Sequence, residues 1–263
     1  MISAKTKTEG IRKIIHSILM IGQSNMAGRG VMSEAGPLDH EHIKVLKNGR
    51  WQPACRPINF DRSFSGVSLV EKFAEAYQKE KNVTVGIIPC ADGGTSLAQW
   101  RVGGLLYDHA VMMTRLAQRT STVAAVLWHQ GEADCSPDLW PTYAARLRVI
   151  FESLRRDLGL DDVPFLVGGL GDFLPQYIVP TNLKNYYHVN DQLRLLANEM
   201  PLVGYVPAEG LSAKPDNLHF DTAGLNAFGL RYYEVFKTLE KKDRLFPDKP
   251  GEDAAIRSAM ELL

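Results

Sequence analysis

The sequence lacks the cysteine content of a disulfide-stabilised protein. Only three of its 263 residues are cysteines, and they stand far apart at Cys55, Cys90 and Cys135, with no C-x-x-C pair. An odd number of widely spaced cysteines favours free thiols in a reducing compartment over a disulfide framework. We therefore expect a cytoplasmic protein.

The sequence also has no excess of either charge. It contains 30 basic and 30 acidic side chains, so its formal net charge is zero. Strong nucleic-acid binding depends on a surplus of Lys and Arg that neutralises phosphates, and binding to an anionic membrane surface depends on a similar surplus. The charge balance therefore gives no support for a nucleic-acid or membrane partner.

Long hydrophobic runs are missing as well. The longest, Ile14–Ile21, is interrupted by His16 and Ser17 and is far too short to span a bilayer. Basic residues precede it, as they do in a secretory signal, but the apolar stretch is weak and no clear small-residue cleavage site follows. We interpret this run as the buried first strand of the fold.

Short apolar runs alternate with helical patterns along most of the chain. We expect buried strands at 14–21, 83–88, 123–128, 165–168 and 202–206, with amphipathic helices between them. Strands that are apolar on both faces and alternate with helices predict a parallel sheet covered on both sides. A small hairpin is also expected at 43–51, because Asn48-Gly49 is typical of a type I′ turn.

This pattern predicts one α/β domain over residues 14–240. Residues 1–13 are polar, and we expect them to be loose. Residues 241–263 read as a linker rich in proline followed by a short helix. The sequence leaves the oligomeric state open, and a homo-oligomer is possible.

Polar, glycine-containing clusters follow several of the predicted strands. They are Gly22–Gly28, Cys90–Ser96 and His129–Asp134, with Asp216–His219 just before the last helix. In an open α/β sheet, ligands bind at the carboxyl ends of the strands. We therefore expect the functional site where these clusters meet.

Two of the clusters contain the residue types of a serine hydrolase. Ser24 follows a buried strand and is a candidate nucleophile, although helix capping is the common role of a serine at such a junction. His219 is a candidate base, and the D-x-x-H spacing lets Asp216 hold its imidazole; an ordinary surface turn is the alternative. His129 is the only rival base. A metal site with Asp221 lacks supporting ligand clusters.

The other two clusters offer donors and a second carboxylate. Gly93-Gly94 lets the backbone approach a substrate and point an N–H group at it, unless it is only a tight turn. Gln130 is an uncharged donor for an oxyanion. Glu132 is an alternative acid, and otherwise caps a helix or fixes the Gly93 loop.

Further polar and aromatic residues near these motifs suggest a sugar-binding surface, with solvated surface as the default for each arginine. The candidate substrate-binding residues are Gln23, Asn25, Arg62, Trp100 and Arg101, with Arg29 nearby.

Taken together and in this order, the motifs resemble one family. The strings G-Q-S-N-M at Gly22–Met26, G-G-T-S at Gly93–Ser96 and H-Q-G-E at His129–Glu132, with Asp216-x-x-His219, are similar to those of the SGNH-type hydrolases. The likeness is strongest to the branch that contains sialate O-acetylesterases and the acetylxylan esterases of carbohydrate esterase family 6. It runs from about residue 14 to about residue 239, and the whole chain resembles bacterial proteins described as acetylxylan-esterase-related.

The resemblance implies a flavodoxin-like three-layer α/β/α sandwich, with a central parallel five-stranded sheet in the order 2-1-3-4-5. It implies Ser24 as nucleophile, His219 as base, and an oxyanion hole formed by the N–H groups of Ser24 and Gly94 and the side chain of Gln130. The wider superfamily has an asparagine of a G-x-N-D string where Gln130 stands. For the acid we favour Asp216, with Glu132 as the alternate.

The implied activity is a serine esterase that removes O-acetyl groups from a small acetylated carbohydrate through an acetyl-enzyme, without a metal or organic cofactor. Two alternatives stay open. One is an esterase or lipase of the same fold acting on other small acyl esters. The other is a catalytically inert sugar-binding domain.

Overall fold

The computed structural model describes residues 15–179, 181–241 and 246. The segment predicted to be loose, 1–13, lies outside these residues. So does the linker and helix predicted over 241–263, apart from Lys241 and Phe246.

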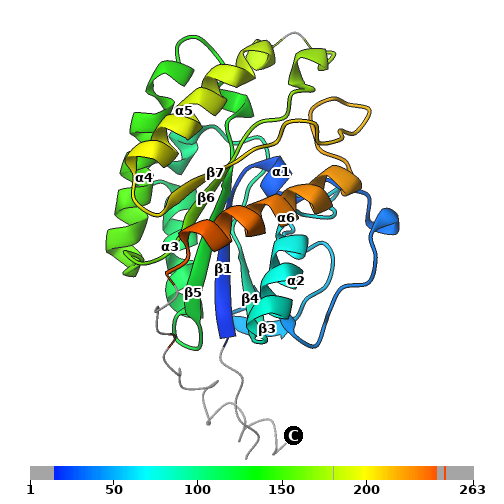
Figure 1. Ribbon diagram of the computed structural model, residues 1–263, viewed down its shortest axis with the longest axis vertical. Coiled ribbons are helices and arrows are strands. Elements are labelled where there is room, and N and C mark those ends of the chain that lie inside the picture. The colour runs from blue at the N-terminus through cyan, green and yellow to red at the C-terminus, as the bar shows by residue number, and fades with distance from the viewer. Residues whose placement is uncertain (1–14, 180, 242–245, 247–263) are drawn as a thin grey trace, which may run out of the picture.

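The centre of the molecule is a parallel sheet of the predicted kind (Figure 1). The five strands that the apolar runs predicted are parallel: β1 (Ile15–Gly22), β4 (Thr84–Pro89), β5 (Thr122–His129), β6 (Phe165–Gly168) and β7 (Val203–Val206). They lie side by side in the order β4-β1-β5-β6-β7, which is the expected 2-1-3-4-5 arrangement. The apolar runs form these strands because both faces of the sheet are covered.

The predicted hairpin enlarges this sheet by two strands. β2 (Ile43–Lys47) pairs in parallel with β4, and β3 (Arg50–Pro53) pairs antiparallel with β2, so the sheet has seven strands in the described part of the chain. Asn48 and Gly49 have φ values of 53° and 74°, as a type I′ turn requires. The hairpin joins the sheet because its apolar residues Ile43, Val45 and Leu46 are buried there.

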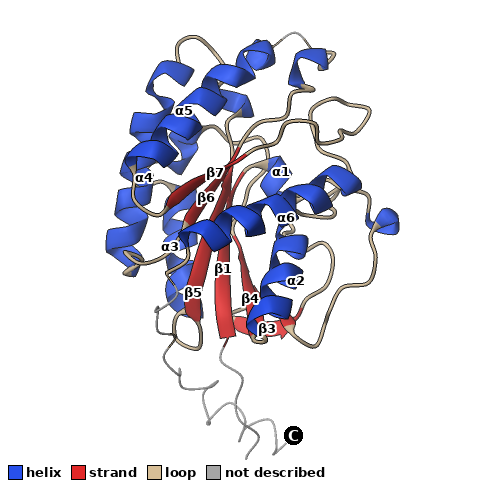
Figure 2. Cartoon of the chain, viewed as in Figure 1, coloured by secondary structure: helices blue, strands red, loops and turns tan. Residues whose placement is uncertain are grey.

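Helices cover the sheet on both faces (Figures 1 and 2). On the near face, α2 (Val70–Lys81) packs against α6 (Thr222–Leu239). α3 (Leu105–Ala117) lies behind the sheet and contacts α4 (Tyr143–Leu158), while α5 (Tyr186–Glu199) packs against α4 and β7. The short α1 (Ser24–Ala27) follows β1 at the carboxyl edge of the sheet.

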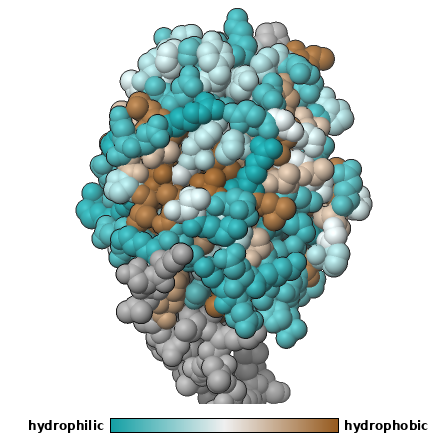
Figure 3. Space-filling model, in the orientation of Figure 1, coloured by the Kyte–Doolittle hydropathy of each residue, from teal (hydrophilic) through white to brown (hydrophobic). Residues whose placement is uncertain are grey.

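The surface of the near face is mostly hydrophilic, and its hydrophobic side chains gather in a few patches (Figure 3). Among the described residues, no helix is both long enough and apolar enough to cross a bilayer. The predicted motif clusters follow β1, β4 and β5, so the loops that carry them meet at one edge of the sheet.

Candidate active site

The nucleophile candidate lies on a tight turn after β1. Gly22 has a φ of 130°, and a Cβ there would stand 2.1 Å from the His129 carbonyl oxygen, so only glycine allows the two strands to approach this closely. Gln23 N–H donates to that same carbonyl at 2.8 Å. The Ser24 side chain makes no helix cap, because Gln23 occupies the N-cap position of α1. Its Oγ lies 3.1 Å from Nε2 of His219 instead.

A carboxylate stands on the other side of His219. Oδ2 of Asp216 lies 2.8 Å from Nδ1 of the imidazole, while Oδ1 accepts the backbone N–H groups of Leu218 and His219 at 2.9 and 3.0 Å. Burial by itself would raise the pKa of Asp216, but the hydrogen bonds from His219 and from the backbone outweigh it and hold the pKa below its usual value. The D-x-x-H spacing thus produces a charged carboxylate that faces the imidazole.

Glu132, the alternate acid, contacts a different partner. Its Oε1 accepts a hydrogen bond from Asn25 Nδ2 at 2.7 Å. Asn25 also donates to the Leu218 carbonyl at 3.3 Å and accepts from the Phe220 N–H group at 3.1 Å. Asn25 directly follows Ser24 and holds both chain neighbours of His219, so Glu132 fixes the two loops to each other through Asn25.

His129 and Asp221, the rival base and the possible metal ligand, have structural roles. His129 is completely buried, its Nε2 lies 3.1 Å from the Gly169 carbonyl, and burial lowers its pKa, so the ring is neutral. Asp221 caps α6 by accepting the Gly224 N–H at 2.7 Å. Among the residues that the structure describes, no cluster of three or more His, Cys, Asp or Glu side chains is arranged to hold a metal ion.

The loop after β4 brings two glycines beside the nucleophile. A Cβ on Gly93 would stand 3.4 Å from Cβ of Ser24 and 2.3 Å from a guanidinium nitrogen of Arg29. The Gly93 N–H donates to Oδ2 of Asp61 at 2.8 Å. Gly94 is exposed and has a φ of 78°, a left-handed conformation that glycine adopts readily.

A buried ion pair supports this loop. Arg29 donates to both carboxylate oxygens of Asp61 at 3.0 and 2.7 Å, and both side chains are only 3% exposed. Burial would raise the pKa of Asp61, but the hydrogen bonds from Arg29 and Ser65 and from the Gly93 backbone lower it, so the carboxylate is charged. Bidentate pairing gives this wall of the site a fixed geometry.

Gln130 lies in a second buried network behind the site. Its Nε2 stands 2.7 Å from Oδ2 of Asp134, 3.1 Å from the Thr95 carbonyl and 3.3 Å from Oε1 of Gln23. The same Asp134 oxygen accepts the Leu97 N–H at 2.7 Å. Asp134 is therefore the carboxylate that holds the loop after Gly94, a task that the sequence suggested for Glu132.

The five residues expected to bind substrate are distributed over several environments. Gln23 and Arg62 line cavities, and Arg101 is exposed. Trp100 is 1% exposed and donates to Thr95 Oγ1 at 3.1 Å, so it does not form the exposed wall that the sequence suggested. Asn25, also 1% exposed, directs its amide at protein groups. Both are buried because their polar atoms find partners in the loops around them.

Sequence reasoning missed Asp61 and Asp134. Asp134 ends the same polar cluster as Gln130, and that proximity was a usable signal. Asp61 lies outside every cluster, and its pairing with Arg29 and Gly93 becomes visible only in three dimensions.

A cavity of about 450 Å³ opens next to the residues that precede Ser24 and His219 in the chain. Gln23 and Leu218, the residues that precede Ser24 and His219, contribute to its wall, together with Glu132, Ser136 and Tyr177. The lining of this cavity combines polar and apolar side chains, as the lining of small-molecule sites does.

The three-layer fold and the match to a carbohydrate-esterase family define the class: this is a hydrolase of the SGNH type. A family model described as "Carbohydrate esterase, sialic acid-specific acetylesterase" matches residues 15–238, and the chain belongs to this family. Membership supports esterase activity.

Known proteins show the same likeness. The chain is 27% identical over 249 residues to the probable carbohydrate esterase At4g34215 of Arabidopsis thaliana, covering 83% of this chain and 88% of that one. The crystal structure of the Arabidopsis protein has a TM-score of 0.76 at 26% identity, covering 86% of this chain and 98% of that one.

Two more distant structures share the fold. NanS has a TM-score of 0.66 at 18% identity, covering 86% of this chain and 97% of its own. XAC1771, a carbohydrate acetylesterase from Xanthomonas citri, also has a TM-score of 0.66, at 16% identity, covering 88% of this chain and 57% of its own.

Proposed function

We propose that the protein is a serine esterase that hydrolyses O-acetyl esters on carbohydrates, of the acetylxylan or sialate type. The observation that carries the proposal is the line of contacts from Ser24 Oγ to His219 Nε2 at 3.1 Å and from His219 Nδ1 to Asp216 Oδ2 at 2.8 Å. A nucleophile, a base and an orienting carboxylate within hydrogen-bond reach are the requirement for acyl transfer at serine.

In the first half of the reaction, Ser24 Oγ attacks the acetyl carbonyl carbon while His219 Nε2 takes the hydroxyl proton. Asp216 accepts the Nδ1–H group, which fixes the tautomer in which Nε2 is free to act as the base. As the tetrahedral intermediate collapses, the bond to the sugar oxygen breaks and His219 returns the proton to that oxygen. The deacetylated sugar leaves, and Ser24 carries the acetyl group.

The oxyanion of this intermediate is bound by the N–H groups of Ser24 and Gly94 and by the side chain of Gln130. The Gly93 N–H is already donated to Asp61, which leaves Gly94 as the donor from that loop. Asp134 accepts a hydrogen bond from one of the two Nε2 hydrogens of Gln130. The other is shared between two longer contacts at 3.1 and 3.3 Å, and a developing anion attracts it more strongly than neutral oxygens do.

In the second half, His219 takes a proton from a water molecule that attacks the acetyl-enzyme carbonyl. The bond to Ser24 Oγ breaks, His219 reprotonates that oxygen, and acetate leaves. The cavity beside Gln23 and Leu218 holds the acetylated sugar ring, since its wall offers both hydroxyl partners and apolar surface.

Replacement of the nucleophile tests the mechanism. Ser24→Ala is expected to lower kcat on p-nitrophenyl acetate by roughly 10⁴-fold or more, as loss of a triad serine does. The melting temperature should hardly change, because only one hydroxyl is removed. If the variant keeps more than a tenth of the wild-type rate, Ser24 is not the nucleophile.

The substrate class is tested by a panel of esters. Acetylated xylan fragments and O-acetyl sialic acid should be hydrolysed, and rates on p-nitrophenyl esters should fall steeply from acetate to octanoate. A deep apolar acyl pocket would instead reward each added methylene by about 0.8 kcal/mol. Equal or faster cleavage of octanoate would reject the carbohydrate acetylesterase and favour a lipase of the same fold.

A further inference from the structure

We propose that a second cavity, beside the loop Asn59–Ser65, is a subsite for a neighbouring sugar residue of the glycan, with Phe60 as its stacking platform. This inference rests on the proposed function and adds that the substrate is an acetylated oligosaccharide. The cavity measures about 260 Å³ and is separate from the one beside Gln23 and Leu218. That is slightly below the range of about 300–1,000 Å³ typical of drug-sized ligands, as expected for a single sugar ring.

The cavity is connected to the catalytic site through the residues that hold Gly93. Arg62 donates to the Gly93 carbonyl at 2.9 Å and pairs with Asp92 at 2.8 Å. Both charged side chains line the cavity, and Gly93 is adjacent to Ser24. A glycan whose acetyl group lies at Ser24 and whose next sugar residue extends past Gly93 meets the side chain of Arg62, which lines the cavity.

The loop that presents Phe60 is firmly anchored. The Asn59 side chain makes two hydrogen bonds with the backbone of Ala91. Asn59 Nδ2 donates to the Ala91 carbonyl at 3.0 Å, and Asn59 Oδ1 accepts from the Ala91 N–H group at 3.1 Å. Asp61 accepts from Gly93 N–H at 2.8 Å. The residues on both sides of Phe60 are thus tied to the loop after β4. A platform held in place before binding loses little conformational entropy when the ligand arrives.

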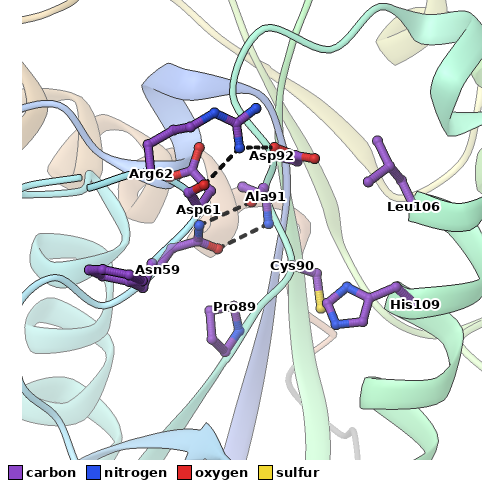
Figure 4. Close-up of a pocket in the computed structure, with 10 residues that line it drawn as sticks. Asn59, Asp61, Arg62, Pro89, Cys90, Ala91, Asp92, Leu106 and His109 are labelled. Carbon is purple, nitrogen blue, oxygen red and sulfur yellow. Dashed lines mark hydrogen bonds and ion pairs between the residues drawn. The ribbon is translucent and has the colours of Figure 1, made fainter. Parts of the chain in front are cut away.

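The chemistry of the lining matches a carbohydrate. Phe60 is 76% exposed and lines the cavity, so its ring is free to contact a bound ligand. Sugar rings offer an apolar C–H face to such a side chain, while their hydroxyls pair with charged groups. Arg62 and Asp92 supply such groups on one side, and Leu106 and His109 of α3 form the opposite wall (Figure 4).

The cavity is not a second catalytic centre. Its one thiol, Cys90, is buried, and burial raises the pKa of the thiol well above its ordinary value, so it stays protonated. The side chains of Cys90 and His109 point toward each other in Figure 4, and this pair closes the cavity on the side of α3. The Cys90 thiol is therefore not activated as a nucleophile.

The same loop provides a matched control. Phe64 is 68% exposed, but it lies over the guanidinium of Arg29 at 5.2 Å and does not line the cavity. Phe60→Ala and Phe64→Ala remove the same side chain from the same loop, and the subsite predicts that only the first affects longer substrates.

The experiment compares kcat and KM on mono-O-acetylated xylose, xylobiose and xylotriose and on p-nitrophenyl acetate. For the wild type, kcat/KM should rise from xylose to xylobiose. Phe60→Ala should raise KM for the two oligosaccharides by about tenfold, the value of one aromatic contact with its burial. It should leave p-nitrophenyl acetate and acetylated xylose unchanged. His109→Ala, on the opposite wall, should reduce the same chain-length gain.

Two results would overturn the subsite: no gain from xylose to xylobiose in the wild type, or equal effects of Phe60→Ala and Phe64→Ala on the oligosaccharides. Either leaves the esterase proposal standing as long as acetylated xylose is cleaved. If p-nitrophenyl acetate is cleaved and no acetylated sugar of the full panel is, the carbohydrate substrate fails and the subsite fails with it.

Discussion

The loop of Asp216 and the loop that ends β5 both bring carboxylates to the site, and they use them differently. Asp216 has a 37% exposed side chain, and within the described part of the chain its hydrogen bonds all come from its own loop: from the imidazole of His219 and from two backbone N–H groups. Glu132 and Asp134 are buried, with side chains 4% and 0% exposed, and they contact loops more than 30 residues away.

This difference separates an exposed carboxylate with local partners from two buried carboxylates with distant partners. The Asp216 carboxylate beside His219 is open to solvent, and its partners come from a turn of four residues. The buried carboxylates hold other loops in register, since an unpaired charge at such depth would be costly. Variants of Asp216, Asp134 and Glu132 test this difference through their effects on kcat and on the melting temperature.

The largest effect is expected at Asp216. Asp216→Asn should lower kcat by about 10⁴-fold, because an amide lets the imidazole take the wrong tautomer. KM should change little, and the melting temperature should fall by a small but measurable amount at neutral pH, since the side chain is partly exposed but its charge is stabilised by hydrogen bonds. The check is steady-state kinetics on p-nitrophenyl acetate together with thermal unfolding. A loss of less than tenfold would remove Asp216 from the triad.

A smaller effect is expected at Asp134, which acts on Gln130. Asp134→Ala should lower kcat by about 10²- to 10³-fold, the usual cost of one oxyanion donor, because Gln130 loses its charged acceptor. KM should be nearly unchanged. Asp134→Asn should restore much of the rate, since its amide oxygen still accepts from Leu97 and Gln130. Equal rates for both variants would contradict this positioning role.

Glu132→Gln is expected to cost less than tenfold in kcat, far less than loss of the triad acid. The amide oxygen of glutamine still accepts the hydrogen bond that Asn25 donates to Glu132. Kinetics of Glu132→Gln and Asp216→Asn under one condition give the direct comparison. A larger loss for Glu132→Gln would make the glutamate the acidic member of the triad.

The smallest effect is a dependence of stability on acid pH. The pKa of Asp216 is lowered in the folded state, so its carboxylate stabilises the fold above the unfolded value of about 3.9. That contribution disappears as the pH falls through the lowered folded pKa. The difference in melting temperature between wild type and Asp216→Asn should therefore shrink below about pH 4. A difference that stays constant from pH 7 to pH 3 would contradict the assignment.

How much of the fold and of the candidate site could be predicted depends on how far apart in the sequence the contacting residues lie. The five parallel strands were predicted correctly, because continuous apolar runs between amphipathic helices indicate a parallel sheet covered on both faces. Their order was implied by the resemblance to the SGNH-type hydrolases, and the structure confirms it. The contact between Asp216 and His219 was also predicted, since three residues of chain dictate it.

Contacts between distant loops could not be predicted in the same way. Asn25 and Glu132 are 107 residues apart, and Asp61 and Gly93 are 32 apart. A single sequence does not state which loop residues will face each other. Trp100 was placed at the surface because it follows a polar motif, but its large apolar ring packs against Trp128 in the core. The roles of the site residues stay predictions until variants are measured.

The separation of Ser24 and His219 along the chain has a consequence for biosynthesis. They are 195 residues apart, and their contact forms only when α6 and the loop before it are added to a sheet begun by β1. A ribosome releases Ser24 near the start of this domain and His219 close to the end of the domain. Nascent chains should therefore have no esterase activity until the domain is essentially complete. Any fragment that ends before His219 should stay inactive.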